Sequence, residues 1–291
     1  MAKKIIAVAG ATGAQGGGLV RAILDDPGGG FMARAITRKP DGDKAKALAA
    51  AGVEVVAADI DNLSSLVKAF QGADAAFCVT NFWEHFSPQK ETEQGKNLAM
   101  AAKEAGLKHV IWSTFEDTRK EVPLTDHRMP TLQVKYKVPH FDAKADADRF
   151  FTEANLPVTF LYTSFYWDNL IFFGMGPKKG PEGHLILTLP MGDKKLPGMA
   201  AGDIGGCAYG VFKRGAEFVG KTVGVAGEHL TGTQMAAALS KALGQEVKYN
   251  EVTPEVYRGF GFPGADDLGN MFQFKRDFEE YFCGARDLNE S

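Results

Sequence analysis

Short apolar runs alternate with longer amphipathic segments over about the first 160 residues, and this alternation constrains the fold more than any other feature. Such segments are the βα units that build a parallel sheet. The expected strands are Lys4–Ala9, Ala33–Thr37, Val53–Ala57, Ala75–Val79, His109–Ser113 and Val158–Leu161. The expected helices are Gly16–Asp25, Asp43–Ala51, Asn62–Phe70, Gln89–Ala105 and Phe141–Ala154. Because the strands are continuously apolar, helices should cover both faces, which predicts an α/β chain with a doubly wound parallel sheet.

The pattern changes after Leu161. Residues 162–202 are rich in aromatic residues, glycine and proline, with one expected hairpin strand at His184–Leu189. The remaining expected elements are helices at Ala208–Arg214, Thr231–Leu243 and Ala265–Tyr281 and a strand at Thr222–Val225. We therefore expect two domains. The first is residues 1–161, to which 203–226 returns, and the second is a smaller, discontinuous α+β domain of residues 162–202 and 227–291.

Composition excludes several classes of protein. With 45% hydrophobic residues in 291, the chain can bury a substantial core. Its 33 basic and 36 acidic residues, with no basic cluster, argue against direct nucleic-acid binding. Three scattered cysteines and singly placed histidines predict neither a disulfide scaffold nor a metal site. The start of the chain lacks a signal-peptide pattern, and the apolar stretch Leu156–Met175 is broken by polar residues. We expect no membrane span and a cytoplasmic protein, with a nuclear location also open.

A glycine-rich loop joins the first expected strand to the first expected helix, and its glycines are Gly10, Gly13 and Gly16. Gly10 permits a tight turn, Gly13 lets the backbone approach a pyrophosphate, and Gly16 allows close helix packing. The helix N-terminus adds free N–H donors and the positive end of a dipole. A purely structural turn is the alternative, but the strand-loop-helix context favours dinucleotide binding on a Rossmann-type sheet.

Basic residues follow the second expected strand, where an NAD site usually carries an acid for the ribose 2′-hydroxyl. Arg38 can make a forked contact with a 2′-phosphate, and Lys39 adds a second cation. This favours NADP(H) over NAD(H); the alternative is two solvated surface cations. Asp59, after the third expected strand, is placed to accept a hydrogen bond from the adenine amino group.

The catalytic residues of a short-chain dehydrogenase are incomplete here. Ser113 or Thr114 lies near the carboxyl end of the fifth expected strand, where a carbonyl-polarising hydroxyl belongs. His140 stands four residues before Lys144, in place of the tyrosine of a YxxxK pair. His140 can donate a proton in principle, but it can equally cap the helix or pack beneath the cofactor. Lys144 can hold ribose hydroxyls in either case. No catalytic residue is therefore assigned; Lys144, His140 and Ser113 are candidates.

Two further motif matches stand in the wrong context. Residues 215–222 fit the Walker A pattern, but they follow an expected helix and open an expected strand, the reverse of a P-loop. Tyr209 and Lys213 have YxxxK spacing but come after the sixth expected strand rather than the fifth.

Together the motifs resemble the NmrA-like family over nearly the whole chain. The segments that carry the likeness are Gly10–Gly16, Thr37–Pro40, Val79–Glu84, Glu93–Lys96, His140–Lys144, Phe165–Leu170, Leu189–Asp193 and Gly261–Phe272. The last two lie in the smaller expected domain, which makes the likeness more specific than a glycine loop. It fades after Cys283, so partner contacts made by the family's tail do not transfer.

The resemblance implies an atypical short-chain dehydrogenase/reductase fold that binds NADP(H) and acts as a regulator responding to the NADPH/NADP balance, with dimer formation and protein partners. It implies pyrophosphate binding by Gly10, Thr12, Gly13, Ala14, Gln15 and Gly16. It places the 2′-phosphate at Arg38, with Lys39 beside it, the adenine at Asp59 and Ile60, and the ribose side at Thr80, Asn81 and Phe82. It places the nicotinamide half at Lys96, Lys144, Ser164, Phe165, Tyr166 and Trp167.

Two functions remain in competition. The missing tyrosine beside a complete cofactor loop favours an NADP(H)-sensing regulator, a redox sensor without efficient catalysis. The alternative is an NADPH-dependent reductase that uses Lys144 or His140, as in isoflavone-reductase-like relatives that also dispense with the tyrosine.

Overall fold

The computed structural model describes residues 2–288, which form two compact units. The first unit runs from residue 2 to Glu116 and adds Ala143–Thr163 and Ala201–Val223. The second contains Asp117–Asp142 and Ser164–Ala200 and continues from Gly224 to residue 288. The main difference from the expected boundaries is Asp117–Asp142, which was expected in the first domain.

Hydrogen bonds explain why Asp117–Asp142 belongs to the second unit. The Asn270 side-chain amide donates to the carbonyl oxygens of Pro130 at 2.9 Å and Lys137 at 2.6 Å. The Gln273 amide donates to the carbonyl oxygen of Arg128 at 2.9 Å. These side chains satisfy backbone groups of a segment with little regular structure of its own.

The sheet of the first unit has seven strands within residues 2–288, in the order β11-β6-β5-β4-β1-β2-β3. They are β1 Lys4–Ala9, β2 Phe31–Thr37, β3 Glu54–Ala57, β4 Ala75–Cys78, β5 His109–Thr114, β6 Val158–Tyr162 and β11 Thr222–Gly224. Strand β1 pairs in parallel with both β2 and β4, so the strand order reverses there. The carboxyl ends of β1 and β4 thus form the switch point at which open α/β sheets bind ligands. This confirms the expected fold class.

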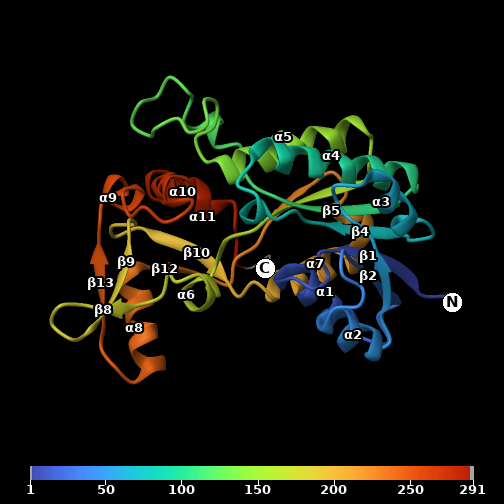
Figure 1. The fold of residues 1–291 in the computed structure, drawn as a ribbon, viewed down its shortest axis with the longest axis horizontal. Coiled ribbons are helices and arrows are strands. Elements are labelled where there is room, and N and C mark those ends of the chain that lie inside the picture. The colour runs from blue at the N-terminus through green and yellow to red at the C-terminus, as the bar shows by residue number, and fades with distance from the viewer. Residues whose placement is uncertain (1, 289–291) are drawn as a thin grey trace. The chain divides into compact units, whose positions relative to one another are not determined.

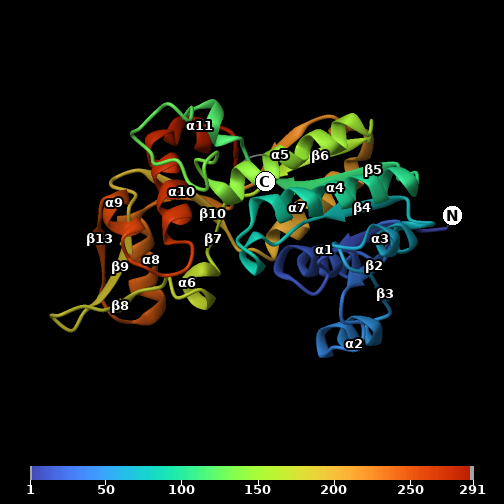
Figure 2. The same cartoon turned by 45° about the horizontal axis from the view of Figure 1, so that its top comes forward.

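Helices cover both faces of this sheet. They are α1 Ala14–Asp25, α2 Asp43–Ala50, α3 Leu63–Phe70, α4 Pro88–Glu104, α5 Pro139–Glu153 and α7 Asp203–Arg214, with short 3₁₀ turns η1 Phe82–Glu84 and η3 Gly215–Phe218. Figures 1 and 2 show α1 and α7 on one face and α4 and α5 on the other. Under the second pair lies an apolar cluster in which the Trp112 and Phe151 rings stack at 4.9 Å.

Helices α1 and α7 approach each other through glycines. A Cβ atom on Gly18 would overlap the carbonyl oxygen of Gly202, and one on Gly205 would overlap the backbone of Leu19. Helix α7 begins at Asp203 rather than the expected Ala208, because the glycines that allow this packing also weaken the helical pattern.

The second unit contains two three-stranded sheets among the described residues, β12-β10-β7 and β13-β9-β8. Its strands are β7 Phe165–Tyr166, β8 Lys178–Lys179, β9 Leu185–Leu189, β10 Lys195–Met199, β12 Glu228–Thr231 and β13 Val247–Glu251. Its helices are η2 Thr118–Lys120, α6 Asn169–Phe172, α8 Gly232–Leu243, α9 Pro254–Arg258, α10 Ala265–Asp277 and α11 Glu279–Gly284. The expected hairpin is present, because β9 pairs with β8 in antiparallel fashion.

The expected single helix Ala265–Tyr281 is wrong, because the chain leaves the helical conformation at Phe278 (φ −119°, ψ 41°). The break lets Tyr281 and Phe282 both contact the ring of Phe274, with ring centroids 6.4 Å away in each case. Across the described residues, no helix combines the length and the apolar character needed to cross a membrane.

Candidate functional site

The glycine loop has the backbone geometry that its sequence predicts. Gly10 has φ +67°, a left-handed conformation that glycine adopts without strain. The N–H of Gly13 donates to the carbonyl oxygen of Gly10 at 2.8 Å, which closes the turn. A Cβ atom on Gly16 would collide with that same carbonyl group. The missing side chain of Gly16 therefore lets helix α1 lie close to the glycine loop. The missing side chain of Gly18 lets α1 pack closely on α7.

The N-terminus of α1 is open to an anion. Gly13 occupies the N-cap position, and within residues 2–288 no side chain caps the helix. The first turn of a helix carries N–H groups without intrahelical partners. A twelve-residue helix also presents the positive end of its dipole here. The loop therefore fits a pyrophosphate, because its side-chain-free glycines leave room and its amides supply donors.

Two expected site residues meet beside this loop. The Ser113 hydroxyl, buried at the end of β5, donates to the side-chain oxygen of Gln15 at 2.9 Å. The Ser113 hydroxyl hydrogen thus points at Gln15. This hydrogen bond ties the first turn of α1 to strand β5 of the sheet. A carbonyl-polarising role for Ser113 would require this bond to open.

Arg38 carries an ion pair that the sequence pattern did not suggest. Its Nη2 atom lies 2.9 Å from each carboxylate oxygen of Glu84, in the η1 turn after β4. Asn81 orients that carboxylate, because its amide lies 3.4 Å from Glu84 Oε1. Arg38 and Lys39 are both exposed beyond the end of β2.

The loop after β3 is held against helix α4. The N–H of Asp61 donates to Asp59 Oδ1 at 3.0 Å, and the Gln94 amide donates to Asp61 Oδ1 at 2.8 Å. The Asn97 amide donates to the carbonyl oxygen of Ile60 at 3.0 Å. Asp59 and Ile60, the expected adenine contacts, are half-buried in this loop.

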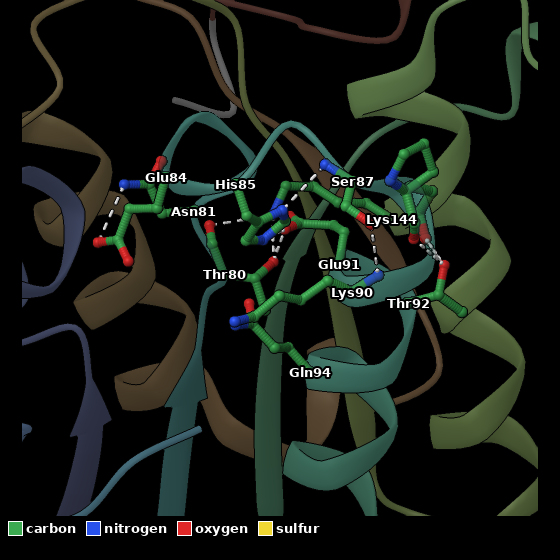
Figure 3. A network of polar contacts seen from close by, with 12 residues as sticks. Thr80, Asn81, Glu84, His85, Ser87, Lys90, Glu91, Thr92, Gln94 and Lys144 are labelled. Atoms are coloured by element: carbon green, nitrogen blue, oxygen red, sulfur yellow. Dashed lines mark hydrogen bonds and ion pairs between the residues drawn. The ribbon is translucent and has the colours of Figure 1, made fainter. Parts of the chain in front are cut away.

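Lys144 lies in a buried polar cluster with Thr80, Glu91 and His85 (Figure 3). Its ammonium nitrogen is 2.7 Å from Glu91 Oε1, 2.6 Å from the Thr80 hydroxyl and 3.2 Å from the Thr80 carbonyl oxygen. The Thr80 hydroxyl in turn donates to Glu91 Oε1 at 2.6 Å. These contacts occupy the three N–H donors of Lys144, so a ribose hydroxyl must replace one of them to be bound.

Glu91 is the most deeply buried member of the cluster, with 0% exposure. Burial alone would raise its pKa, but Lys144, His85 and Thr80 together lower the pKa to about 2. His85 Nε2 lies 3.3 Å from Glu91 Oε2, and His85 Nδ1 accepts a hydrogen bond from the Ser87 N–H at 3.1 Å. Because Nδ1 is an acceptor, the neutral imidazole carries its hydrogen on Nε2, facing the carboxylate.

The sequence pattern missed Glu91 and His85. The sequence nevertheless contained a sign that Glu91 is buried. At helical spacing, Glu91 shares one face of α4 with Gly95, Leu98 and Ala102, and all four residues are buried. A charged residue at an apolar-face position requires a buried partner of opposite charge. The structure places the expected nicotinamide contact Lys96 elsewhere on α4, with its ammonium 5.8 Å from the centre of the Phe150 ring.

His140, one turn before Lys144 on α5, pairs with Asp267, and both residues belong to the second unit. Its Nδ1 atom lies 2.6 Å from Asp267 Oδ1, and its backbone N–H donates to Asp267 Oδ2 at 3.1 Å. Both side chains are buried. The carboxylate thus orients the imidazole and anchors the first turn of α5.

The remaining expected cofactor contacts, Ser164, Phe165, Tyr166 and Trp167, also lie in the second unit, in or next to strand β7. The Ser164 hydroxyl is buried and has no hydrogen-bond partner among residues 2–288. The ring of Trp167 packs against Gly198 of β10, where a Cβ atom would collide with it.

The rejected motifs are structural. Tyr209 donates to Asp26 Oδ2 at 3.1 Å, and Lys213 contacts the same oxygen at 2.8 Å. Asp26 follows the last residue of α1, at the opposite end of that helix from the glycine loop. Residues 215–218 form the turn η3 between α7 and β11, so the Walker A match follows a helix and leads into a strand.

Comparison with known proteins gives one consistent result. The profile of the NmrA-like family matches residues 2–288. The NmrA-like family domain-containing oxidoreductase FrzB from Cladobotryum sp is 30% identical, and the alignment covers 93% of this chain and 83% of FrzB.

Solved structures of the negative transcriptional regulator NmrA are also similar. The NmrA complex with NAD superposes with a TM-score of 0.80 at 26% identity, covering 100% of this chain and 90% of that one. The NADP complex gives 0.77 at 27% identity, covering 96% and 84%. With the family profile matched across nearly the whole sequence, the chain belongs to the NmrA-like family.

Proposed function

We propose that this chain binds NADP(H) and acts as a regulator that responds to the NADPH/NADP balance, without efficient catalysis. The observation that carries the proposal is the open N-terminus of α1 behind a closed glycine turn, with Arg38 at the end of the neighbouring strand. Two of the NmrA structures that superpose on the chain are complexes with NAD and NADP. We base the proposed sensing role on a resemblance, because the motifs of this sequence are similar to those of the human NmrA-like redox sensor protein.

In this proposal the chain's residues divide the nucleotide among them. The amides of Ala14, Gln15 and Gly16 bind the pyrophosphate, and Gly10, Thr12 and Gly13 line the loop. Asp59 and Ile60 contact the adenine, Arg38 and Lys39 the 2′-phosphate, and Lys144 a ribose hydroxyl. The other proposed contacts are Thr80, Asn81, Phe82, Lys96, Ser164, Phe165, Tyr166 and Trp167. When bound, the nicotinamide would supply hydride chemistry.

The replacement of tyrosine by His140 supports the regulatory role. A short-chain dehydrogenase uses that tyrosine to protonate its substrate, whereas His140 is buried and bound by Asp267 through both its ring and its backbone. Lys144 is likewise held by Glu91 and Thr80. His140, which stands in place of the tyrosine, and Lys144 are thus each held by a structural partner.

A reductase is the second candidate. It is favoured by the names of the relatives, several of which are called oxidoreductases. It is also compatible with the His140–Asp267 pair, because a carboxylate at Nδ1 orients the imidazole. In this alternative Lys144 or His140 acts as the catalytic residue.

Single-turnover NADPH oxidation separates the two candidates. The protein is saturated with NADPH and mixed with aldehydes, quinones or enones while the nicotinamide absorbance is followed. The regulator predicts bound NADPH and turnover below roughly 0.1 per second, against about 10 per second for a typical enzyme. Faster turnover that is lost in His140→Ala, with binding retained, would establish the reductase instead.

The resemblance also implies a homodimer and a regulatory protein partner, which we retain as proposals together with a cytoplasmic location. Sedimentation with and without saturating NADP(H) tests the first. We expect NADP(H) to shift the balance between monomer and dimer. An unchanged balance would mean that nucleotide binding does not control the oligomeric state.

A further inference from the structure

The Arg38–Glu84 ion pair places an anion on the side chain proposed for the 2′-phosphate. Both oxygens of Glu84 lie 2.9 Å from Arg38 Nη2. We propose that Glu84 is a specificity-determining residue, whose carboxylate competes with the 2′-phosphate for Arg38 and so reduces the preference for NADP(H) over NAD(H). This inference rests on the proposed function, because it concerns the same nucleotide site.

The backbone presents Glu84 from a fixed position. It is the last residue of η1, which follows β4 at the switch point of the sheet. Phe82, at the start of this turn, is 3% exposed, and its ring lies 5.4 Å from Trp83 and 6.2 Å from Phe86. Figure 3 shows the Asn81 amide directed at the Glu84 carboxylate. The turn is thus anchored by the buried Phe82 ring, while the Glu84 carboxylate is half exposed.

The ion pair is accessible enough to exchange. The Arg38 and Glu84 side chains are 54% and 46% exposed. Exposed ion pairs contribute little net stability, because water solvates the separated charges well. A phosphate monoester carries about −1.5 to −2 charges at neutral pH, more than a carboxylate. The 2′-phosphate can therefore displace Glu84, but its affinity is reduced by the contact that it must replace and by repulsion from the displaced carboxylate.

NAD(H) does not compete with Glu84 for Arg38. It has no 2′-phosphate, so Arg38 and Glu84 can stay together. Glu84 thus penalises one nucleotide without penalising the other.

Among the described residues, Asp61 also carries a carboxylate that interacts electrostatically with Arg38. Asp61 has its pKa lowered by Gln94 and Lys90, against the effect of burial, and Arg38 contributes to this lowering. Its carboxylate is 2.9 Å from the Lys90 ammonium. Because Asp61 has this cation beside it, Glu84 is the carboxylate that a variant should remove.

The test uses the adenosine half of the nucleotide alone. Adenosine 2′,5′-bisphosphate and AMP differ only in the 2′-phosphate, and calorimetry gives the affinity of each for the full chain. Glu84→Gln keeps the size of the side chain and removes its charge. We expect it to tighten bisphosphate binding by about 3- to 10-fold and to change AMP binding by less than about 2-fold.

Glu104→Gln is the matched control. It makes the same change in net charge at the exposed C-terminal end of α4, about 25 Å along the helix from its start at the sheet's carboxyl edge. We expect no change in either affinity. Glu84→Ala, with thermal unfolding recorded for every variant, shows that the effect comes from the lost charge rather than from glutamine or altered folding.

The outcomes are distinct. A rise in bisphosphate affinity for both Glu84 variants, but not for Glu104→Gln, supports the competition. If wild type binds both ligands and the Glu84 variants leave their ratio unchanged, the competition is overturned while the proposed function stands. If wild type binds neither fragment and neither NADP(H) nor NAD(H), the proposed function itself fails and the competition with it.

Discussion

At the scale of the residue, the Glu91–Lys144 pair has the strongest energetic consequences. Both groups are buried, and Thr80 and His85 complete their contacts. A buried ion pair is not necessarily more stable than a well-packed apolar pair, but removing one partner leaves an uncompensated charge. The two residues should therefore act as a unit.

We expect Glu91→Gln to lower the free energy of unfolding by about 3–5 kcal/mol, because Lys144 stays buried without its carboxylate. Urea denaturation measures the change. The double variant Glu91→Gln/Lys144→Met, which removes both charges, should recover most of it. Equal losses in the single and double variants would contradict the pairing.

The pKa of Glu91 sets a pH window. Its folded pKa of about 2 lies below the ordinary value of 4.5, so ionised Glu91 stabilises the fold above the ordinary value. This stability is lost as the pH falls from about 5 toward 2. The free energy of unfolding should thus fall more steeply over this range in wild type than in Glu91→Gln. Parallel pH profiles would show that Glu91 does not contribute.

Arg38 gives a prediction for the nucleotide. A charged hydrogen bond is worth about 1.5–3 kcal/mol, so Arg38→Ala should weaken NADP(H) roughly 10- to 100-fold and leave NAD(H) nearly unchanged. Calorimetric titration of both nucleotides provides the comparison. Equal losses for the two would mean that Arg38 does not contact the 2′-phosphate.

At the scale of the element, neighbouring glycines of α7 differ in what surrounds them. Gly205 is buried against α1, whereas Gly206 is exposed, and a Cβ built on it meets no described atom from outside its own helix turn within 4 Å. Gly205→Ala should destabilise the protein by about 1–3 kcal/mol through overpacking. Gly206→Ala should stabilise it by about 0.5–1 kcal/mol, because alanine favours the helix. Thermal unfolding of the two variants tests this, and effects of the same sign would refute the assigned packing.

The sequence pattern predicted elements where apolar periodicity is long and continuous. Strands β1 to β6 and helices α1 to α5 appear within a few residues of their expected bounds. Strand β10 was missed because Pro197 and Gly198 obscure its pattern. The break at Phe278 was missed because the apolar pattern of Ala265–Tyr281 continues across it, although the backbone leaves the helix there.

At the scale of the whole molecule, the glycine loop and Arg38 were recognisable because their chemistry is carried by residue type and spacing. The partners Glu84 and Glu91 were not, because they lie 46 and 53 residues away from Arg38 and Lys144 and only the fold brings them together. The sequence pattern could not show that Asp117–Asp142 belongs to the second unit for the same reason. This assignment depends on hydrogen bonds from Asn270 and Gln273, which are distant in the sequence.

We expect the glycine loop of the first unit to bind NADP(H). Calorimetric titration of NADPH into wild type and Gly16→Ala tests it most directly, because a Cβ at Gly16 collides with the Gly10 carbonyl and distorts the loop locally. We predict stoichiometric binding to wild type, tighter for NADPH than for NADH, and a loss of at least about 10-fold in a Gly16→Ala protein that still unfolds cooperatively. Absence of binding to wild type, or equal affinity in the variant, would contradict this expectation.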